Sequence, residues 1–485
     1  MMKKEVLILS LLFVALAPAY PKIVLSNAFC DNMVLQQDTL VKLWGKANSG
    51  SKIIINVSWA RKVFSTNSDS HGTWTAYIST PKASYNPQTI RISGDNTSVT
   101  IKNVLIGEVW VCLGQSNMEM PVDGFECNPV VRANQIIAES GKYKGIRCLM
   151  VQQNEDAFVP QTMMKRGSWE ISCPKNVPHF SASAYYFAIS LNKVLDVPIG
   201  ILVAAWGATQ IESWLPQQIL KDCKDIDINK LNEKINPANK PELVYNGMVH
   251  PIAGYTSKGF IWYQGESNVH GWEWDGSNQN GTVHYADRLK AFVNVLRSEW
   301  KQNDMPFYVI EIAPFRYFDK DALGAAYLRE SQYKAVKAMA KCGLVCTNDL
   351  VDSTEIDIIH PKDKLNLGER LTWLVLRNDY KFDGIEPYSP EFKSMEVKGD
   401  KVVLSFENTK NGFTQTENYK GFEVAGADKV FHSAVGKMVN VQQIEIYSPE
   451  VKSPVAVRYC FRNFLLGNVA NTRGLPLIPF RTDNW

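Results

Sequence analysis

The sequence predicts an α/β protein whose central region is a doubly wound parallel sheet, with a β-sandwich before it and a β-rich region after it. Between about 104 and 384, short apolar segments alternate with segments of helical period, a pattern typical of a parallel sheet covered by helices on both faces. Before and after this region the helical period is missing, and short strands are bounded by turn residues. A chain of 485 residues is also too long for one ordinary core.

The N-terminal segment has the features of a secretory signal peptide over residues 1–19. Lys3 and Lys4 precede an apolar run that ends at Ala17, and a small-x-small sequence ends at Ala19, where we expect cleavage. A retained N-terminal anchor is the alternative. The run is short for a membrane span, and no later segment reaches the necessary length. We therefore expect an exported protein without a membrane partner, periplasmic or extracellular, or lysosomal in a eukaryote.

Residues 20–103 are predicted to form the β-sandwich. Val41–Trp44, Lys52–Val57 and Thr89–Ile92 are predicted strands, because turn residues bound them and no long helical period intervenes.

Residues 104–384 are predicted to form the α/β domain. Its expected elements are strands at 104–113, 199–205, 259–263, 307–312 and 343–347, and helices over 184–195, 285–300, 323–340 and from 361 onward. In such sheets ligands bind at the carboxyl ends of the strands. Polar segments that follow these strands are therefore candidate site residues.

Residues 385–485 are predicted to be β-rich. A Gly-Asp turn at Gly399 predicts a hairpin, and Pro454–Phe461 is a further strand. Two arrangements stay open, a separate module or an extension of the N-terminal sandwich.

The composition is that of a globular protein and excludes some partners. A formal charge of +3 gives no reason to expect nucleic acid or an anionic membrane. The 13 Trp and 19 Tyr suit either a sugar-binding cleft or a large core. Nine cysteines leave at least one thiol without an intramolecular partner. Cys342 and Cys346 lie four apart near a strand, where ordinary buried cysteines are favoured over a metal pair.

The segment Gly114–Met118 contains a candidate nucleophile. Ser116 follows a strand and a glycine and enters a helix, whose N-terminus stabilises negative charge. A nucleophile whose attack creates an oxyanion needs that environment. The alternative is a serine that only caps the helix.

The segment Asp357–Pro361 contains a candidate base. A histidine such as His360 can take the proton of a serine hydroxyl near neutral pH, and a carboxylate such as Asp357 can fix its tautomer. Alternatively, Asp357 caps the following helix and His360 is a surface residue.

Two further loops follow predicted strands. Tyr263–Asn268 offers polar side chains that suit an oxyanion or a plain turn. In Ala205–Trp214, Gly207 can bring a backbone N–H close to a substrate, and the tryptophans can line a sugar site.

Together these segments resemble the SGNH-hydrolase superfamily, and within it the sialate O-acetylesterase family. The matching motifs are Gly-Gln-Ser-Asn-Met at 114–118, Trp-Gly-Gly-Thr-x-Ile-Glu-x-Trp at 206–214, Trp-Tyr-Gln-Gly-Glu-Ser-Asn at 262–268 and Asp-x-x-His-Pro at 357–361, with terminal signatures at 31–36 and 474–483. The resemblance covers nearly the whole chain after the signal peptide. It departs at Ala208, where the family has a second glycine, so we expect a small change in loop shape or pocket width.

The resemblance implies a flavodoxin-like sheet and a serine esterase that removes O-acetyl groups from sialic acid. Ser116 is then the nucleophile, with His360 as its base and Asp357 orienting that base. The oxyanion is held by the N–H groups of Ser116 and Gly207 and by the side-chain amide of Gln264. No metal or cofactor is needed, and Glu266 is expected to orient loops.

Two other functions stay open from the sequence. The first is an acetylesterase for acetylated xylan or another glycan. The second is a non-catalytic carbohydrate-binding protein, against which the set of Ser116, Asp357 and His360 argues. An O-acetylated sugar or glycan is the expected partner, and the oligomeric state is open.

Overall fold

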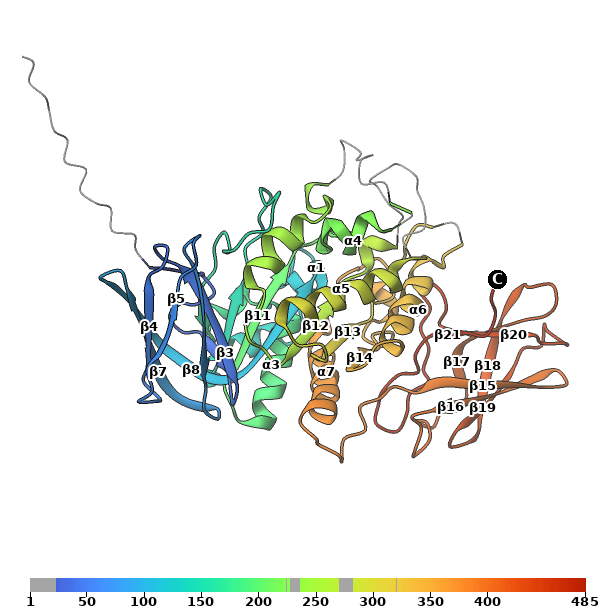
Figure 1. Cartoon of the computed structure of the whole chain (residues 1–485). Helices are drawn as coiled ribbons and strands as arrows, with labels where there is room; N and C mark the ends of the chain where they lie inside the picture. The colour runs from blue at the N-terminus through green and yellow to red at the C-terminus, as the bar shows by residue number, and fades with distance from the viewer. Residues whose placement is uncertain (1–22, 224, 227–235, 270–281, 320) are drawn as a thin grey trace, which may run out of the picture.

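The computed structural model describes residues 23–485 apart from 224, 227–235, 270–281 and 320. Figure 1 shows three regions side by side: N-terminal strands in blue, a region of helices and strands in cyan to orange, and C-terminal strands in red. The predicted signal peptide lies outside the described residues. Within the described part of the chain, no helix has the length and apolar character needed to cross a membrane.

The N-terminal region consists of two packed sheets. One contains β1 (Val24–Leu25), β3 (Leu40–Lys46) and β6 (Thr73–Ser79); the other contains β2 (Val34–Gln36), β4 (Lys52–Val57), β5 (Phe64–Asn67), β7 (Ser84–Gly94) and the first part of β8 (Thr97–Gly114). Apolar side chains alternate along the strands, and Leu43, Ile55 and Trp74 are buried members of the hydrophobic core.

The central region is a parallel sheet with an antiparallel strand at one edge. The strand order is β10 (Trp169–Ile171), β9 (Ile146–Met150), β11 (Ile199–Ala205), β8, β12 (Gly259–Tyr263), β13 (Phe307–Ile310) and β14 (Cys342–Val345). All pairings from β9 to β14 are parallel. The mixed α/β class predicted from the sequence is confirmed.

Four long helices of the described chain cover the two faces of this sheet. They are α3 (Ala182–Leu195) and α7 (Lys364–Asp379), which contact each other, and α5 (Tyr285–Trp300) and α6 (Gly324–Lys337), which also contact each other. Alternate residues of β8 face opposite ways, so that Trp110 packs with α3 and α7 while Val111 belongs to the core with α5 and α6. Both faces of the sheet are therefore buried, as its continuous apolar strands require.

Short helices lie in the connections. The α-helices are α1 (Ser116–Glu119), α2 (Ala133–Glu139) and α4 (Gln217–Lys221), and the 3₁₀ and π turns are Ser140–Lys142, Val177–His179, Ile211–Trp214, Pro237–Asn239, Tyr245–Val249, His250–Ile252, Glu266–Asn268 and Ser353–Glu355.

The C-terminal region is an antiparallel sheet of seven strands. In spatial order they are β15 (Glu391–Lys398), β16 (Lys401–Glu407), β19 (Gln443–Tyr447), β18 (Phe431–Asn440), β17 (Tyr419–Ala425), β20 (Ala456–Tyr459) and β21 (Phe480–Arg481). The hairpin predicted at Gly399 is present between β15 and β16, and Gly399 has a φ of 67°. This region contacts the α/β region through Asn463, which accepts a hydrogen bond from the N–H of Ala325 at 2.8 Å.

The strand β8 runs through the predicted boundary between 103 and 104. Its first part pairs with β7 and β2, and its second part pairs with β11 and β12. The N-terminal strands and the parallel sheet are therefore joined by continuous hydrogen bonding. The domain limits at 103 and 384 stay a prediction.

Candidate active site

The candidate nucleophile Ser116 lies at the carboxyl edge of the parallel sheet, in its middle. β8 ends at Gly114, where a Cβ atom would lie 2.1 Å from the carbonyl oxygen of Tyr263 on β12. Only glycine allows this approach. Gln115 then donates its N–H to the same carbonyl at 3.0 Å, and Ser116 begins α1 with a partly exposed side chain. The first N–H groups of a helix have no partner within it, so the N–H of Ser116 is not used by a helical hydrogen bond.

The loops singled out in the sequence meet at this edge. A Cβ built on Gly207 would lie 3.4 Å from the Cβ of Ser116. The Oε1 atom of Gln115 accepts the N–H of Gly265 at 3.1 Å. Asn117, next to Ser116, donates its amide to the carbonyl oxygen of Ile359 at 2.9 Å. These contacts bring four segments together, those that contain Ser116, Gly207, Tyr263–Asn268 and His360.

His360 is a neutral, largely buried imidazole. Its ring packs edge-on against Phe125 at 5.1 Å between centroids. Burial, and then the charge of Lys364, lowers the pKa of His360 to about 4. Its Nε2 atom is buried and has no hydrogen-bond partner among the described residues. A neutral imidazole with a free ring nitrogen has the protonation state that a general base needs at neutral pH.

Asp357, expected to orient His360, is directed at Arg316 in this structure. Arg316 follows β13, and its Nε donates to Asp357 Oδ1 at 2.7 Å while a second guanidinium nitrogen contacts Oδ2. The N–H of Arg316 also bonds the carbonyl of Ile356 at 2.8 Å, which holds the two loops together. Among the described residues, no hydrogen bond joins Asp357 to His360, or His360 to Ser116.

Gln264, expected to donate to the oxyanion, is fully buried and engaged elsewhere. Its Nε2 donates to the carbonyl of Thr209 at 2.9 Å and to Asn268 Oδ1 at 2.8 Å. Its Oε1 accepts the hydroxyl of Tyr285 at 2.9 Å. Both amide hydrogens are used, so in this conformation Gln264 joins two loops and has no hydrogen for an oxyanion.

Gly207, the other expected donor, bonds a carboxylate. Its N–H donates to Glu119 Oε2 at 2.6 Å, and Gln153 donates to Oε1 of the same group at 2.9 Å. Burial raises the pKa of Glu119. Glu119 was not among the site residues predicted from the sequence. The available signal was its position three residues after Ser116 in a short helix, which places it on the same side of the turn.

Asn117 was also missed, although it stands inside the serine motif. Besides the bond to Ile359, its Nδ2 donates to Glu266 Oε1 at 2.6 Å. Burial raises the pKa of Glu266, which is 3% exposed. The expected loop-orienting role of Glu266 is consistent with this contact, because the bond joins the third motif to the first.

In the part of the chain that the structure describes, no group of three or more His, Cys, Asp or Glu side chains is placed to hold a metal ion. All nine cysteines are free, and Cys346 is buried while Cys342 is partly exposed.

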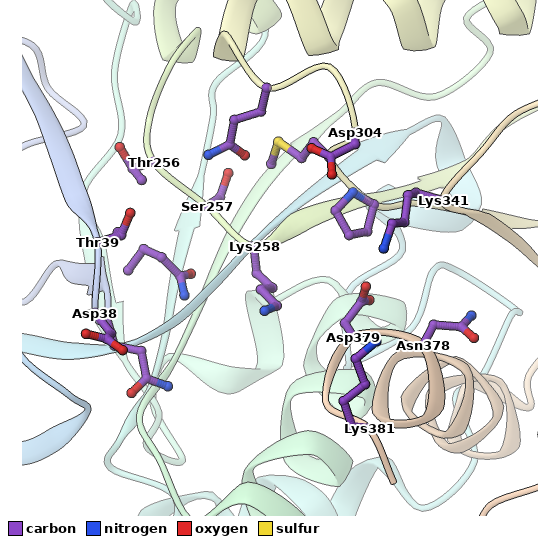
Figure 2. Close-up of a pocket in the computed structure, with 15 residues that line it drawn as sticks. Asp38, Thr39, Thr256, Ser257, Lys258, Asp304, Lys341, Asn378, Asp379 and Lys381 are labelled. Carbon is purple, nitrogen blue, oxygen red and sulfur yellow. The ribbon is translucent and has the colours of Figure 1, made fainter. Parts of the chain in front are cut away.

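A cavity of about 530 Å³ opens at the opposite edge of the sheet (Figure 2). Lys258 and Lys341, which precede β12 and β14, point into it together with Asp379 from the end of α7. These residues precede the strands, whereas Ser116 and Gly207 follow them. This cavity is therefore separate from the candidate active site.

Comparison with known proteins agrees with these motifs. The family profile described as carbohydrate esterase, sialic acid-specific acetylesterase matches residues 106–377, more than half of the chain. The chain belongs to this family. It is accordingly a carboxylic ester hydrolase.

Relatives share most of its length. The sialate O-acetylesterase of Homo sapiens is 24% identical over 417 residues, covering 81% of this chain and 78% of that protein. That of Mus musculus is 23% identical over 451 residues, covering 82% and 81%. The solved structure of a carbohydrate acetylesterase from Xanthomonas citri is 30% identical, covers 96% of this chain and all of that one, and has a TM-score of 0.83.

Proposed function

We propose that this protein is a serine esterase of the SGNH type that hydrolyses O-acetyl groups on a carbohydrate, with O-acetylated sialic acid as the first candidate. The observation that carries the proposal is the bond from Asn117 to Ile359, which brings the segments of Ser116 and His360 to one edge of the sheet. The five strands β11-β8-β12-β13-β14 support the SGNH type, because without β9 they have the flavodoxin-like order 2-1-3-4-5. β9 is an additional parallel strand beyond β11, and with it the order of the parallel strands is 2-3-1-4-5-6.

In the proposed reaction, Ser116 Oγ attacks the acetyl carbonyl carbon while His360 Nε2 takes the hydroxyl proton. The carbonyl oxygen becomes an oxyanion. His360 then gives the proton to the sugar oxygen as the C–O bond breaks, which leaves an acetyl-serine. His360 then takes a proton from a water molecule, whose oxygen attacks the acetyl carbon. As the bond from this carbon to Ser116 Oγ breaks, His360 returns the proton to Oγ, which releases acetic acid and restores Ser116 and neutral His360.

The oxyanion is assigned to the N–H groups of Ser116 and Gly207. Loss of one such donor costs about 3–4 kcal/mol of barrier. Since Gly207 bonds Glu119 in this structure, the substrate oxygen must displace or share that carboxylate. Gln264 has a supporting role, because its hydrogen bond to Thr209 joins the loop that contains Gly207 to the Tyr263–Asn268 loop.

Asp357 is assigned as the residue that orients His360 once its carboxylate leaves Arg316. The side chains of Arg316 and Asp357 are 52% and 54% exposed. Water screens an ion pair between two exposed side chains, so the contact with Arg316 is easily exchanged.

The test is the substitution Ser116→Ala. Acetate release from an acetylated chromogenic ester should fall at least about 10³-fold, because the nucleophile and its base act as a unit. Circular dichroism should be unchanged, since the side chain is partly exposed. Turnover close to that of the wild type would reject the mechanism.

The sugar is decided by comparing substrates. O-acetylated sialic acid and acetylated xylan should be offered at equal concentration, with acetate measured enzymatically. A higher kcat/KM for the sialic acid supports the first candidate, and a higher value for xylan supports the alternative. No release from either, together with no labelling of Ser116 by a fluorophosphonate probe, would favour a non-catalytic binding protein.

A further inference from the structure

A buried lysine lies beside the candidate active site. Lys364 begins α7, four residues after His360, and has no exposed surface. Its ammonium donates to Asn117 Oδ1 at 2.7 Å and lies 5.1 Å from the ring centre of Tyr263. Burying an ammonium group is unfavourable unless specific partners hold it.

The amide of Asn117 is bonded at both ends. Its oxygen accepts from Lys364, and its nitrogen donates to Glu266 Oε1 at 2.6 Å and to the carbonyl of Ile359 at 2.9 Å. An ammonium can only donate and a carboxylate only accept. The carbonyl of Ile359 can also only accept, so it and these two groups together favour one orientation of the amide, the one in which its nitrogen faces Ile359.

We propose that Asn117, with its amide fixed by Lys364 and Glu266, is a positioning residue that sets the place of His360 relative to Ser116. This inference rests on the proposed function. Asn117 is covalently next to the serine, and Ile359 is next to the histidine, so a single hydrogen bond joins segments 242 positions apart.

The arrangement bears on the reaction and not only on stability. Proton transfer from Ser116 to His360 needs heavy atoms within about 3 Å, and a displacement of about 1 Å can reduce the rate about 10²-fold. If the amide turned over, its oxygen would face the carbonyl of Ile359. That repulsion would push the histidine loop away from α1.

The first experiment compares Asn117→Ala with Asn471→Ala as a matched control. Asn471 is a buried, hydrogen-bonded amide in the C-terminal region, far along the chain from the site. We expect Asn117→Ala to lower kcat about 100-fold with KM within about twofold, and the control to keep the wild-type kcat. A kcat for Asn117→Ala within threefold of the wild type would overturn the inference.

The second experiment asks whether the amide orientation matters, and it decides the case if Asn117→Ala does not fold. Asn117→Asp replaces the donor by a carboxylate that faces Glu266. Adding Glu266→Gln supplies a new donor opposite that carboxylate. We expect the kcat of the double variant to be at least about tenfold higher than the kcat of Asn117→Asp. No recovery in a folded double variant would contradict the inference.

The third experiment uses a pH profile, which a purely structural role would leave unchanged. The base must be neutral, so kcat/KM falls as the pH drops through the pKa of His360, which burial and then Lys364 hold at about 4. Glu266, Asp363 and Glu355 face Lys364, and burial lowers its pKa to about 7, so it is charged in this acid range.

Lys364→Met removes this charge and should move the acid limb of kcat/KM to higher pH as well as lowering kcat. If the acid limb of the kcat/KM profile stays at the same pH and kcat is unchanged, Lys364 does not have this role. Failure of the proposed function is distinguishable, because then Ser116→Ala would keep its activity. Failure of the inference alone leaves Ser116→Ala inactive and Asn117→Ala active.

Discussion

The contact between Glu119 and Gly207 places a carboxyl group where the proposed reaction develops a negative charge. The carboxylate accepts the N–H that the mechanism assigns to the oxyanion. An ionised Glu119 and an oxyanion bound to the same N–H group would repel each other. This repulsion is stronger where burial lowers the effective dielectric constant. An ionised Glu119 should therefore slow attack, whereas a protonated Glu119 should not.

We predict that Glu119→Gln raises kcat/KM several-fold at neutral and higher pH. Burial raises the pKa of Glu119, so its charge is lost on acidification at a higher pH than for an ordinary carboxyl. The advantage of the variant should shrink as the pH falls through that pKa, because the wild-type group becomes neutral as well. The measurement is the ratio of the two pH profiles. A variant slower than the wild type at every pH would show that Glu119 assists the reaction.

The sequence was enough to predict which residues of the candidate site lie near one another. It was not enough to predict the directions of their side chains. The sequence placed Ser116, Gly207 and His360 after strands of one sheet, and the structure brings their segments together. Asp357 is directed at Arg316 because a guanidinium offers two parallel donors, and a spacing of three residues does not fix a rotamer. Gln264 is engaged by Thr209, a contact that depends on loop geometry.

Among the elements, the pair α3 and α7 is packed through Gly368. A Cβ at this position would lie 2.7 Å from the backbone nitrogen of Phe187 and 2.7 Å from the carbonyl carbon of Tyr186, both on α3. Backbone atoms cannot move aside as a side-chain tip can, so the helices approach closely only with glycine here.

Gly368→Ala is therefore expected to destabilise the protein by about 1–3 kcal/mol, since an added methyl group forces the helices apart. Because α7 begins with Lys364, kcat should fall as well. Denaturant unfolding and acetate release check the two effects. Exposed Gly384, whose Cβ would meet no atom within 4 Å, provides the control Gly384→Ala. A stability equal to that of the wild type would contradict the packing argument.

Several elements were predicted to their ends. The strands at 199–205 and 259–263 and the helix over 285–300 have the predicted bounds, because apolar period and flanking turn residues agree there. β8 begins seven residues before the predicted start at 104, since its first part is half-exposed and pairs with β7. A half-exposed strand and a buried parallel strand have different patterns, so only the buried part of β8 was predicted.

At the scale of the whole molecule, the C-terminal sheet is tied to the α/β region by Asn463. This buried side chain accepts the N–H of Ala325 in the first turn of α6 and donates to the carbonyl of Tyr317 at 3.2 Å. The two regions share this contact beside the loop that carries Arg316.

Asn463→Ala leaves a buried N–H of α6 unsatisfied, which costs about 1–3 kcal/mol. We expect the thermal transition measured by calorimetry to fall by a few degrees. Asn411→Ala, at an exposed position, should leave it unchanged. An unaltered transition in Asn463→Ala would mean that the C-terminal sheet contributes no stability through this contact.

The continuity of β8 has a consequence for any attempt to shorten the protein. Excision of the strands before it would strip residues 97–106 of their neighbours β7 and β2 and leave Ile101, Val104 and Ile106 uncovered. An unpaired and apolar sheet edge of this kind pairs with other chains and leads to aggregation. The α/β region is therefore expected to precipitate when it is produced without the N-terminal strands. A shortened protein that stays in solution must contain the N-terminal strands together with the α/β region.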